Sequence, residues 1–173
     1  FFTDDELMII KEAIEDHRAS AKEEPRSIYG RIVSSADRNN RVEDCLRRTY
    51  TYGKKLNPDA TDEELFLRAY DVLVNKFGED GYAKFYFKDT QYENFLKELR
   101  ELLKDQEKFI NTQRAYIEQL KKEILMEYKN GRFNFNGDFV YAVNKDIKRY
   151  DGIGKSFLGE KKKEFDIDNS SDE

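Results

Sequence analysis

The stretch EDHRASAKEEPRSIYGRIVSSADRNN, residues 15–40, connects two helical patterns and carries most of the residues on which a functional hypothesis can rest. It holds the single histidine of the chain, His17, at the end of the first pattern and the pair Asp37–Arg38 near the end of the second. Side chains that suit anion binding lie between them: Arg18, Ser20, Lys22, Arg26 and Tyr29. A plain helical connection does not need so many such groups, so this stretch is predicted to form half of a metal and phosphate site.

The first helix is predicted from a capping box and an apolar stripe. The Thr3 and Glu6 side chains can each bond the backbone amide of the other residue, which predicts that a helix begins near Asp4. Apolar side chains then recur at spacings of three and four, ending on the histidine: Leu7, Ile10, Ile14 and His17. Because this spacing places side chains on one helix face, the imidazole is expected to continue a buried stripe.

The second helix is expected after a loop that contains Pro25, whose missing amide suits a loop or a first helical turn. The helix should run from about residue 28 to residue 39. Tyr29, Val33 and Asp37 are spaced four apart within it, so the Asp37 carboxylate is expected on a half-buried face.

Two more helices follow from local signals. A helix over residues 42–52 is predicted to stop at Gly53, which suits a left-handed C-cap. Thr61 and Glu64 form a second capping box, which predicts a helix over residues 62–77.

The next segments are less regular. GEDGYAKFYF, residues 78–87, is ambiguous between a short aromatic helix and an extended piece, and a helical turn is favoured. Helical spacing of apolar residues returns over 90–103, is interrupted by a charged gap at 104–108, and resumes over 109–128. These residues form either two helices or one long helix that projects as an arm.

After residue 131 apolar and polar residues alternate around Asn136 and Gly137, a pair that favours the turn of a β-hairpin. The end of the chain is rich in charges of both signs and is predicted to be disordered. The predicted parts are a helical domain (1–108), an amphipathic helical arm (109–131), a hairpin and loop (132–159) and a charged, disordered tail (160–173). The expected fold class is therefore an all-α helical bundle with a long C-terminal helix and a small β-hairpin.

The composition limits the class of protein. A chain of 173 residues is long enough for one domain with a buried core. No run approaches the roughly 18 apolar residues that a membrane span needs, so no membrane contact is expected and the protein is predicted to be cytoplasmic. Cys45 is the only cysteine and is predicted to be a buried, inert thiol. The formal net charge of -5 repels phosphate backbones, which disfavours nucleic acid as a partner.

His17 and Asp37 are predicted to be metal ligands and catalytic residues, because imidazole nitrogen and carboxylate oxygen suit divalent ions that activate water for phosphate chemistry. The side chains predicted to bind the phosphate are Arg18, Ser20, Lys22, Arg26 and Arg38. The alternative interpretation is a core histidine satisfied by one hydrogen bond. In that case the arginines form ordinary surface ion pairs with carboxylates such as Asp16, Glu23 and Glu24.

The segments EAIEDHR, RSIYG and ADR, in this order and on either side of a proline-containing loop, resemble the later part of an HD-superfamily metal-dependent phosphohydrolase. With the GEDGY segment, the resemblance points to a small bacterial HD-domain protein and covers roughly residues 1–108. It implies an all-α HD-domain fold, a small phosphorylated substrate or nucleotide, and a divalent metal ion. It does not distinguish Mn, Mg, Fe, Zn and Co.

In that family an adjacent His-Asp pair binds the metal together with an earlier histidine and a later aspartate. Asp37 matches the later aspartate, and His17 matches an additional histidine of members that bind a second metal or contact phosphate. The earlier histidine and the His-Asp pair are absent from this sequence. The resemblance therefore implies the C-terminal portion of such an enzyme, inactive as this fragment.

A non-catalytic helical interaction module is the alternative hypothesis. It rests on the absent ligands and on the long amphipathic pattern of residues 109–131, which could pair two copies of the chain as an antiparallel homodimer.

Overall fold

The computed structural model describes residues 1–21 and 23–130. Within them the chain forms six α-helices and no strand, so the prediction of an all-α helical bundle is confirmed. The helices are α1 (Asp4–Asp16), α2 (Ile28–Ala36), α3 (Val42–Leu56), α4 (Asp62–Phe77), α5 (Thr90–Leu103) and α6 (Gln106–Lys129). The predicted hairpin of 132–159 and the predicted tail of 160–173 lie outside the described residues. No helix in the described ranges is both long and apolar enough to cross a membrane.

Both predicted capping boxes are present. The Thr3 hydroxyl accepts from the Glu6 amide at 3.3 Å, and the Glu6 carboxylate accepts from the Thr3 amide at 2.7 Å. Thr61 and Glu64 repeat the arrangement at the start of α4 with the same two distances, 3.3 and 2.7 Å. These contacts satisfy amides that the first turn of a helix leaves without partners, which fixes both helix starts.

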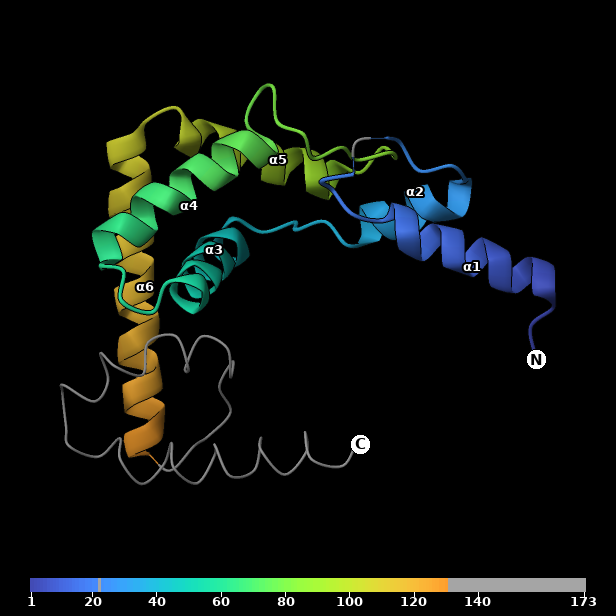
Figure 1. Cartoon of the computed structure of the whole chain (residues 1–173). Coiled ribbons are helices and arrows are strands. Elements are labelled where there is room, and N and C mark those ends of the chain that lie inside the picture. The colour runs from blue at the N-terminus through green and yellow to red at the C-terminus, as the bar shows by residue number, and fades with distance from the viewer. Residues whose placement is uncertain (22, 131–173) are drawn as a thin grey trace.

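The core lies between α3, α4, α5 and α6, which pack together at one end of the molecule (Figure 1). The buried residues at its centre come from all four helices: Cys45, Leu46, Ala69, Leu73, Phe77, Phe95, Leu99 and Phe109. Cys45 is fully buried and accepts a hydrogen bond from the Asn39 side chain at 3.2 Å. Burial raises the pKa of its thiol to about 11, so the sulfur is a protonated, apolar core group at neutral pH.

α1 and α2 form a separate pair that contacts none of the other described helices (Figure 1). The two helices run in the same general direction in Figure 1. Gly30 permits Pro25 of the preceding loop to pack closely on α2, because a Cβ atom at Gly30 would lie 2.9 Å from Pro25 Cβ, whereas its distance to Asp16 Cβ of α1 would be an ordinary 3.4 Å. We call these two helices the α1–α2 pair.

Gly53 does not end α3, so that prediction was wrong. The helix continues to Leu56, and Gly53 is buried inside it. A Cβ atom at Gly53 would lie 3.0 Å from Leu65 Cδ2 and 3.3 Å from an Arg68 guanidinium nitrogen. The glycine therefore serves the close packing of α4 on α3, which local sequence signals do not reveal.

Segment 78–89 is a loop and contains no helix, so the favoured helical turn over 78–87 was wrong. The Tyr82 amide donates to the Asn75 carbonyl at 3.2 Å, and the Ala83 amide donates to the Lys76 carbonyl at 2.9 Å. These bonds fold the start of the loop back along the end of α4. The aromatic residues that follow are consequently carried towards α2.

The charged gap separates two helices. α5 ends at Leu103, and Asp105 begins the next turn by accepting from the Lys108 amide at 3.0 Å. α6 packs on the core through Phe109 and Ile117, which are 0% and 1% exposed. Its N-terminal half is thus part of the bundle, although the sequence allowed it to project as an arm from residue 109.

Candidate functional site

His17 follows the last turn of α1 as its C-cap and is partly buried. Its Nδ1 is hydrogen-bonded to the carbonyl of Ile14, one turn earlier. A ring nitrogen that donates to a backbone carbonyl fixes the orientation of the imidazole and leaves Nε2 as the nitrogen available to another group.

The apolar stripe that leads to His17 is exposed, so the prediction of a buried stripe was wrong. Leu7, Ile10 and Ile14 are 50%, 39% and 59% exposed. The reason is that α2 is the only described helix on which α1 packs, and α1 does so through a different face, which carries Ala13 at 5% exposure.

Asp37 is the C-cap of α2 and is exposed, so its predicted half-buried position was also wrong. Its amide donates to the Val33 carbonyl at 3.1 Å, and the Arg38 amide donates to the Ser35 carbonyl at 3.1 Å, which ends the helix. Tyr29 and Val33, which share its helix face by sequence spacing, are likewise 52% and 39% exposed.

Arg38 brings the ends of the two helices together. Its Nη1 donates to the His17 carbonyl at 3.4 Å, and its Nη2 donates to the Ser34 hydroxyl at 2.6 Å. Its Nε donates to the carbonyl of Lys84, in the loop after α4, at 3.2 Å. The C-terminal ends of α1 and α2, and with them His17 and Asp37, therefore lie at the same end of the pair (Figure 1).

This end of the pair does not supply a complete metal site. Among the described residues no group of three or more histidine, cysteine, aspartate and glutamate side chains is placed to hold a metal ion. Divalent ions in proteins take about four to six donors, so His17 and Asp37 alone do not fit a catalytic metal.

The Arg26 guanidinium is occupied by carboxylates of α1. Its Nε lies 3.1 and 3.0 Å from the two Asp16 oxygens, and its Nη2 donates to Asp16 at 2.9 Å and to Glu15 at 2.8 Å. Its Nη1 lies 3.8 Å from Glu12. Hydrogen bonds from the Arg26 side chain and amide lower the pKa of the Asp16 carboxyl below its ordinary value. This is the surface ion pairing of the alternative interpretation, and it ties the loop to α1.

The other predicted phosphate-binding residues are dispersed. Arg18 and Ser20 are exposed in the loop between α1 and α2, and Lys22 lies outside the described residues. Arg38 is partly buried, and within the described part of the chain no carboxylate lies within ion-pair distance of it. Arg38 is thus the member of the predicted set that is partly buried and that has no carboxylate within ion-pair distance among the described residues.

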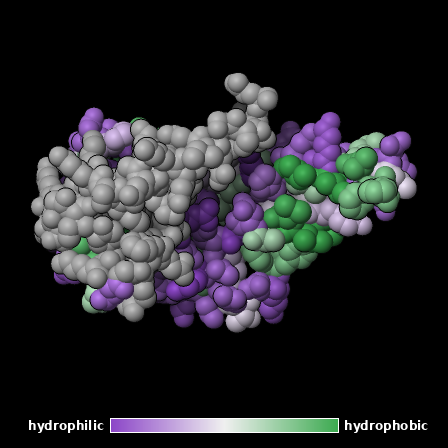
Figure 2. Space-filling model, turned by 90° about the horizontal axis from the view of Figure 1, so that it is seen from below, coloured by the Kyte–Doolittle hydropathy of each residue, from purple (hydrophilic) through white to green (hydrophobic). Residues whose placement is uncertain are grey.

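The feature that the sequence did not reveal is an exposed apolar surface on the α1–α2 pair. Of the seventeen large hydrophobic residues that are exposed in the described part of the chain, eleven lie within residues 1–33. Figure 2 shows the hydrophobic residues of this end gathering into one patch on the face seen from below. We define the α1–α2 apolar surface as Leu7, Ile10, Ile14, Tyr29 and Val33. A helical apolar stripe looks the same in sequence whether its own chain or a partner covers it, so no local signal distinguishes the two cases.

No family model, no curated protein and no solved structure matches this chain, so its resemblance to HD-superfamily phosphohydrolases stays a prediction.

Proposed function

We propose that this chain is a helical interaction module that binds an amphipathic helix on the α1–α2 apolar surface. The observation that carries the proposal is the concentration of exposed large hydrophobic residues on a helix pair that packs on no other described helix. Contiguous apolar patches of this kind mark sites of association, because covering them removes apolar area from water.

The charge of α1 defines the flanks of the partner. The helix carries six carboxylates and the single base Lys11. Arg26 neutralises part of this charge at the C-terminal end, whereas Asp4 and Asp5 at the other end have no ion-pair partner among the described residues. A helix with an apolar face and basic flanks is complementary to this surface.

The surface proposed here replaces residues 109–131 as the site of association. α6 turns its apolar face into the core, and within its described part the only large hydrophobic residue that is exposed is Met126. A homodimer through this helix would have little apolar area to bury.

The test uses two designed amphipathic peptides with the same apolar face, one with lysine flanks and one with glutamate flanks. We expect the lysine peptide to bind the chain at least about tenfold more tightly, because charge complementarity adds to apolar burial. The double variant Ile10→Glu, Ile14→Glu should abolish binding in isothermal titration calorimetry. Met8→Glu is the matched control, because Met8 is as exposed as Ile14 but lies outside the stripe by helical spacing.

Sedimentation of the chain alone separates this proposal from self-association. Equal binding of the two peptides, or binding that survives the double variant, would reject an acidic-rimmed helix site. Self-association that the double variant abolishes would assign the surface to a second copy of the chain and would also reject the proposal.

A metal-dependent phosphohydrolase acting on a nucleotide or small phosphoester is the second candidate, and the orientation of His17 favours it. The bond from Nδ1 to the Ile14 carbonyl leaves the Nε2 of that imidazole open, and Arg38 donates to the backbone carbonyl of the same residue at 3.4 Å. The described residues lack a metal shell, so this function requires further ligands from a polypeptide docked on the neighbouring apolar surface.

Mn²⁺ titration followed by NMR tests whether these two residues share an ion. We expect paramagnetic broadening of the His17 and Asp37 resonances at millimolar Mn²⁺ and its loss at His17 in Asp37→Asn, because a carboxylate and an imidazole then contribute to one weak site. Asp59→Asn is a control at another exposed aspartate. Broadening spread over all exposed carboxylates, with none at His17, would remove the metal hypothesis.

A further inference from the structure

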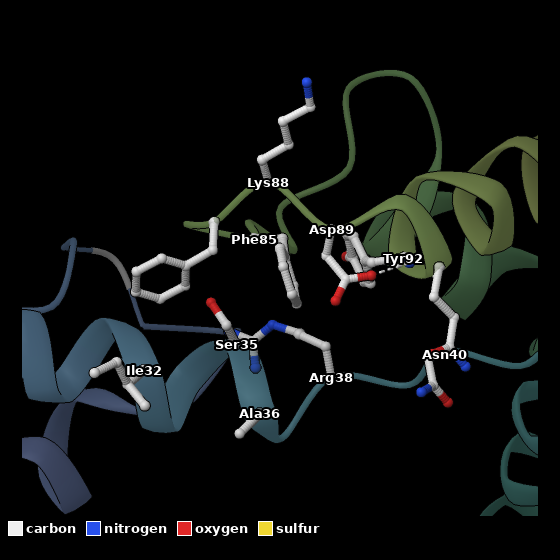
Figure 3. A pocket seen from close by; sticks show the side chains of 11 residues that line it. Ile32, Ser35, Ala36, Arg38, Asn40, Phe85, Lys88, Asp89 and Tyr92 are labelled. Atoms are coloured by element: carbon white, nitrogen blue, oxygen red, sulfur yellow. Dashed lines mark hydrogen bonds between the residues drawn. The ribbon is translucent and has the colours of Figure 1, made fainter.

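A pocket of about 390 Å³ lies between α2, loop 78–89 and the first turn of α5 (Figure 3). Its lining includes both apolar side chains, such as Ile32 and Phe87, and polar ones, such as Arg38 and Asp89. The residues on which the argument depends are Ile32, Ala36, Arg38, Phe85, Phe87 and Tyr92. A volume of this size is within the range that small-molecule sites occupy, roughly 300–1,000 Å³.

Arg38 supplies positive charge to the pocket. Its three hydrogen bonds go to two backbone carbonyls and the Ser34 hydroxyl, which are uncharged acceptors. A guanidinium has five N–H donors, so donors beyond these three are available to a ligand. The Asp89 carboxylate also lines the pocket, but among the described residues no carboxylate lies within ion-pair distance of Arg38, so an anion bound there would supply the charged partner that the guanidinium lacks.

Tyr92 supplies a hydroxyl that lacks a partner. The residue is 4% exposed, and its buried hydroxyl oxygen makes no hydrogen bond within the described part of the chain. Burial raises the pKa of the Tyr92 hydroxyl, although the charge of Arg38 acts in the opposite direction. The hydroxyl is therefore protonated at neutral pH. It can donate a hydrogen bond, but the described residues supply no acceptor for it. Buried polar groups in folded proteins are nearly always paired, so this exception needs an explanation.

Aromatic rings form the rest of the wall. Phe85 stacks on Tyr92 with ring centroids 4.1 Å apart and an interplanar angle of 16°. Figure 3 shows Phe85 lying between the loop above and Arg38 below, with Ile32 and Ala36 on the helix beneath. A flat, apolar ligand would extend this stack, because aromatic groups favour offset-stacked arrangements.

We propose that this pocket binds a small aromatic anion, with the ring against Phe85 and Phe87 and an acidic oxygen accepting from Arg38 and Tyr92. The inference is independent of the α1–α2 apolar surface, since it rests on a different set of residues. A carboxylate and a phosphate share the required chemistry, and the experiment separates them.

The test titrates the chain with benzoate and phenyl phosphate, which pair one ring with two different anions. Benzyl alcohol supplies the ring without the anion, and inorganic phosphate supplies the anion without the ring. We expect at least one aromatic anion to bind about tenfold or more tightly than either half, with amide shifts in heteronuclear NMR centred on residues 85–92. Whichever of the two binds more tightly identifies the acidic group.

Tyr92→Phe removes only the unpartnered hydroxyl and should weaken binding of the aromatic anion about tenfold, which is the effect of losing a hydrogen bond to a charged group. Arg38→Gln should weaken it further. Arg41→Gln is the matched control, since Arg41 pairs with Glu43 at 3.7 Å and does not line the pocket. Binding of the aromatic anions no tighter than that of benzyl alcohol, or unchanged affinity in Tyr92→Phe, would overturn the proposal.

Discussion

Replacing Phe109 with alanine is expected to lower the free energy of unfolding by about 3–5 kcal/mol, the range for truncating a fully buried phenylalanine. Phe109 is 0% exposed and packs edge-on against Tyr70, with ring centroids 5.5 Å apart. The Tyr70 hydroxyl donates to the Leu103 carbonyl at 3.0 Å, which holds its ring beside the end of α5. The cavity left by alanine would lie where α4, α5 and α6 meet, so the surrounding residues have little freedom to fill it. Urea denaturation followed by circular dichroism measures the change.

Met126→Ala is the matched control on the same helix. Met126 is 58% exposed, so its truncation should change the unfolding free energy by no more than about 0.5 kcal/mol. Equal, small effects of the two substitutions would mean that α6 is a detachable arm and that the bundle is held by α3–α5 alone.

A large effect at Phe109 also limits where a second chain could bind. The stripe that a 109–131 dimer would use is occupied inside the chain by Phe109, Gln113 and Ile117. Gln113 donates to the Leu46 carbonyl at 2.8 Å, which pins the same face of α6 to α3. Association through this face would require opening the core.

Local signals predicted the helices well, because the groups that fix a helix start lie within a few residues of each other. The capping boxes at Thr3 and Thr61 are cases of this kind, and both helices begin where the sequence placed them. The chemistry of each box is complete within four residues and does not depend on what the helix packs against.

Positions whose role depends on distant residues were predicted less well. Gly53 looked like a helix end, but its lack of a side chain serves the packing of Leu65, which is twelve residues away. Phe85 sits in a loop whose path is set by hydrogen bonds to the end of α4 and by the Tyr86 amide, which donates to the Ser35 hydroxyl at 3.2 Å. No spacing within GEDGYAKFYF encodes that partner.

In the predicted site, too, the features fixed by nearby residues were predicted and those fixed by distant residues were not. The sequence placed His17 and Asp37 at the ends of consecutive helices, and the structure has both as C-caps. The sequence offered Asp16 as one ion-pair partner of the arginines, but it could not decide that Arg26 would pair with it while Arg38 stayed without a carboxylate, because this pairing depends on the path of the loop along α1. The pocket beside Arg38 includes residues from Ile32 to Tyr92, a span that no local motif covers.

In hydrogen exchange, amides of the α1–α2 pair are expected to exchange at least about 100-fold faster than the slowest amides of α3–α5, a difference of about 3 kcal/mol in opening free energy. The pair packs on no other described helix, whereas α3, α4 and α5 share one core. Its links to the loop after α4 are few and exposed or partly buried, and include Arg38 to the Lys84 carbonyl at 3.2 Å and Lys84 to Glu24 at 3.1 Å. So few contacts oppose local opening of the pair less strongly than a shared apolar core opposes the opening of α3, α4 and α5.

Ser35→Ala provides the decisive variant, because it removes the hydroxyl that accepts from the Tyr86 amide across this junction. We expect faster exchange throughout α1 and α2 and unchanged protection in α3–α5, since the lost bond joins the two parts without entering the core. Ser20→Ala, at an exposed loop position, should leave both groups of amides unaffected.

Uniform protection across all six helices, or loss of protection in α3–α5 together with α1–α2, would mean that the chain opens as one cooperative unit. In that case the α1–α2 apolar surface would be a fixed face of the bundle, and a helix docking on it would stabilise the whole chain. Separate opening instead predicts that a docked helix slows exchange in α1 and α2 alone, since binding can only stabilise the states that carry the intact surface.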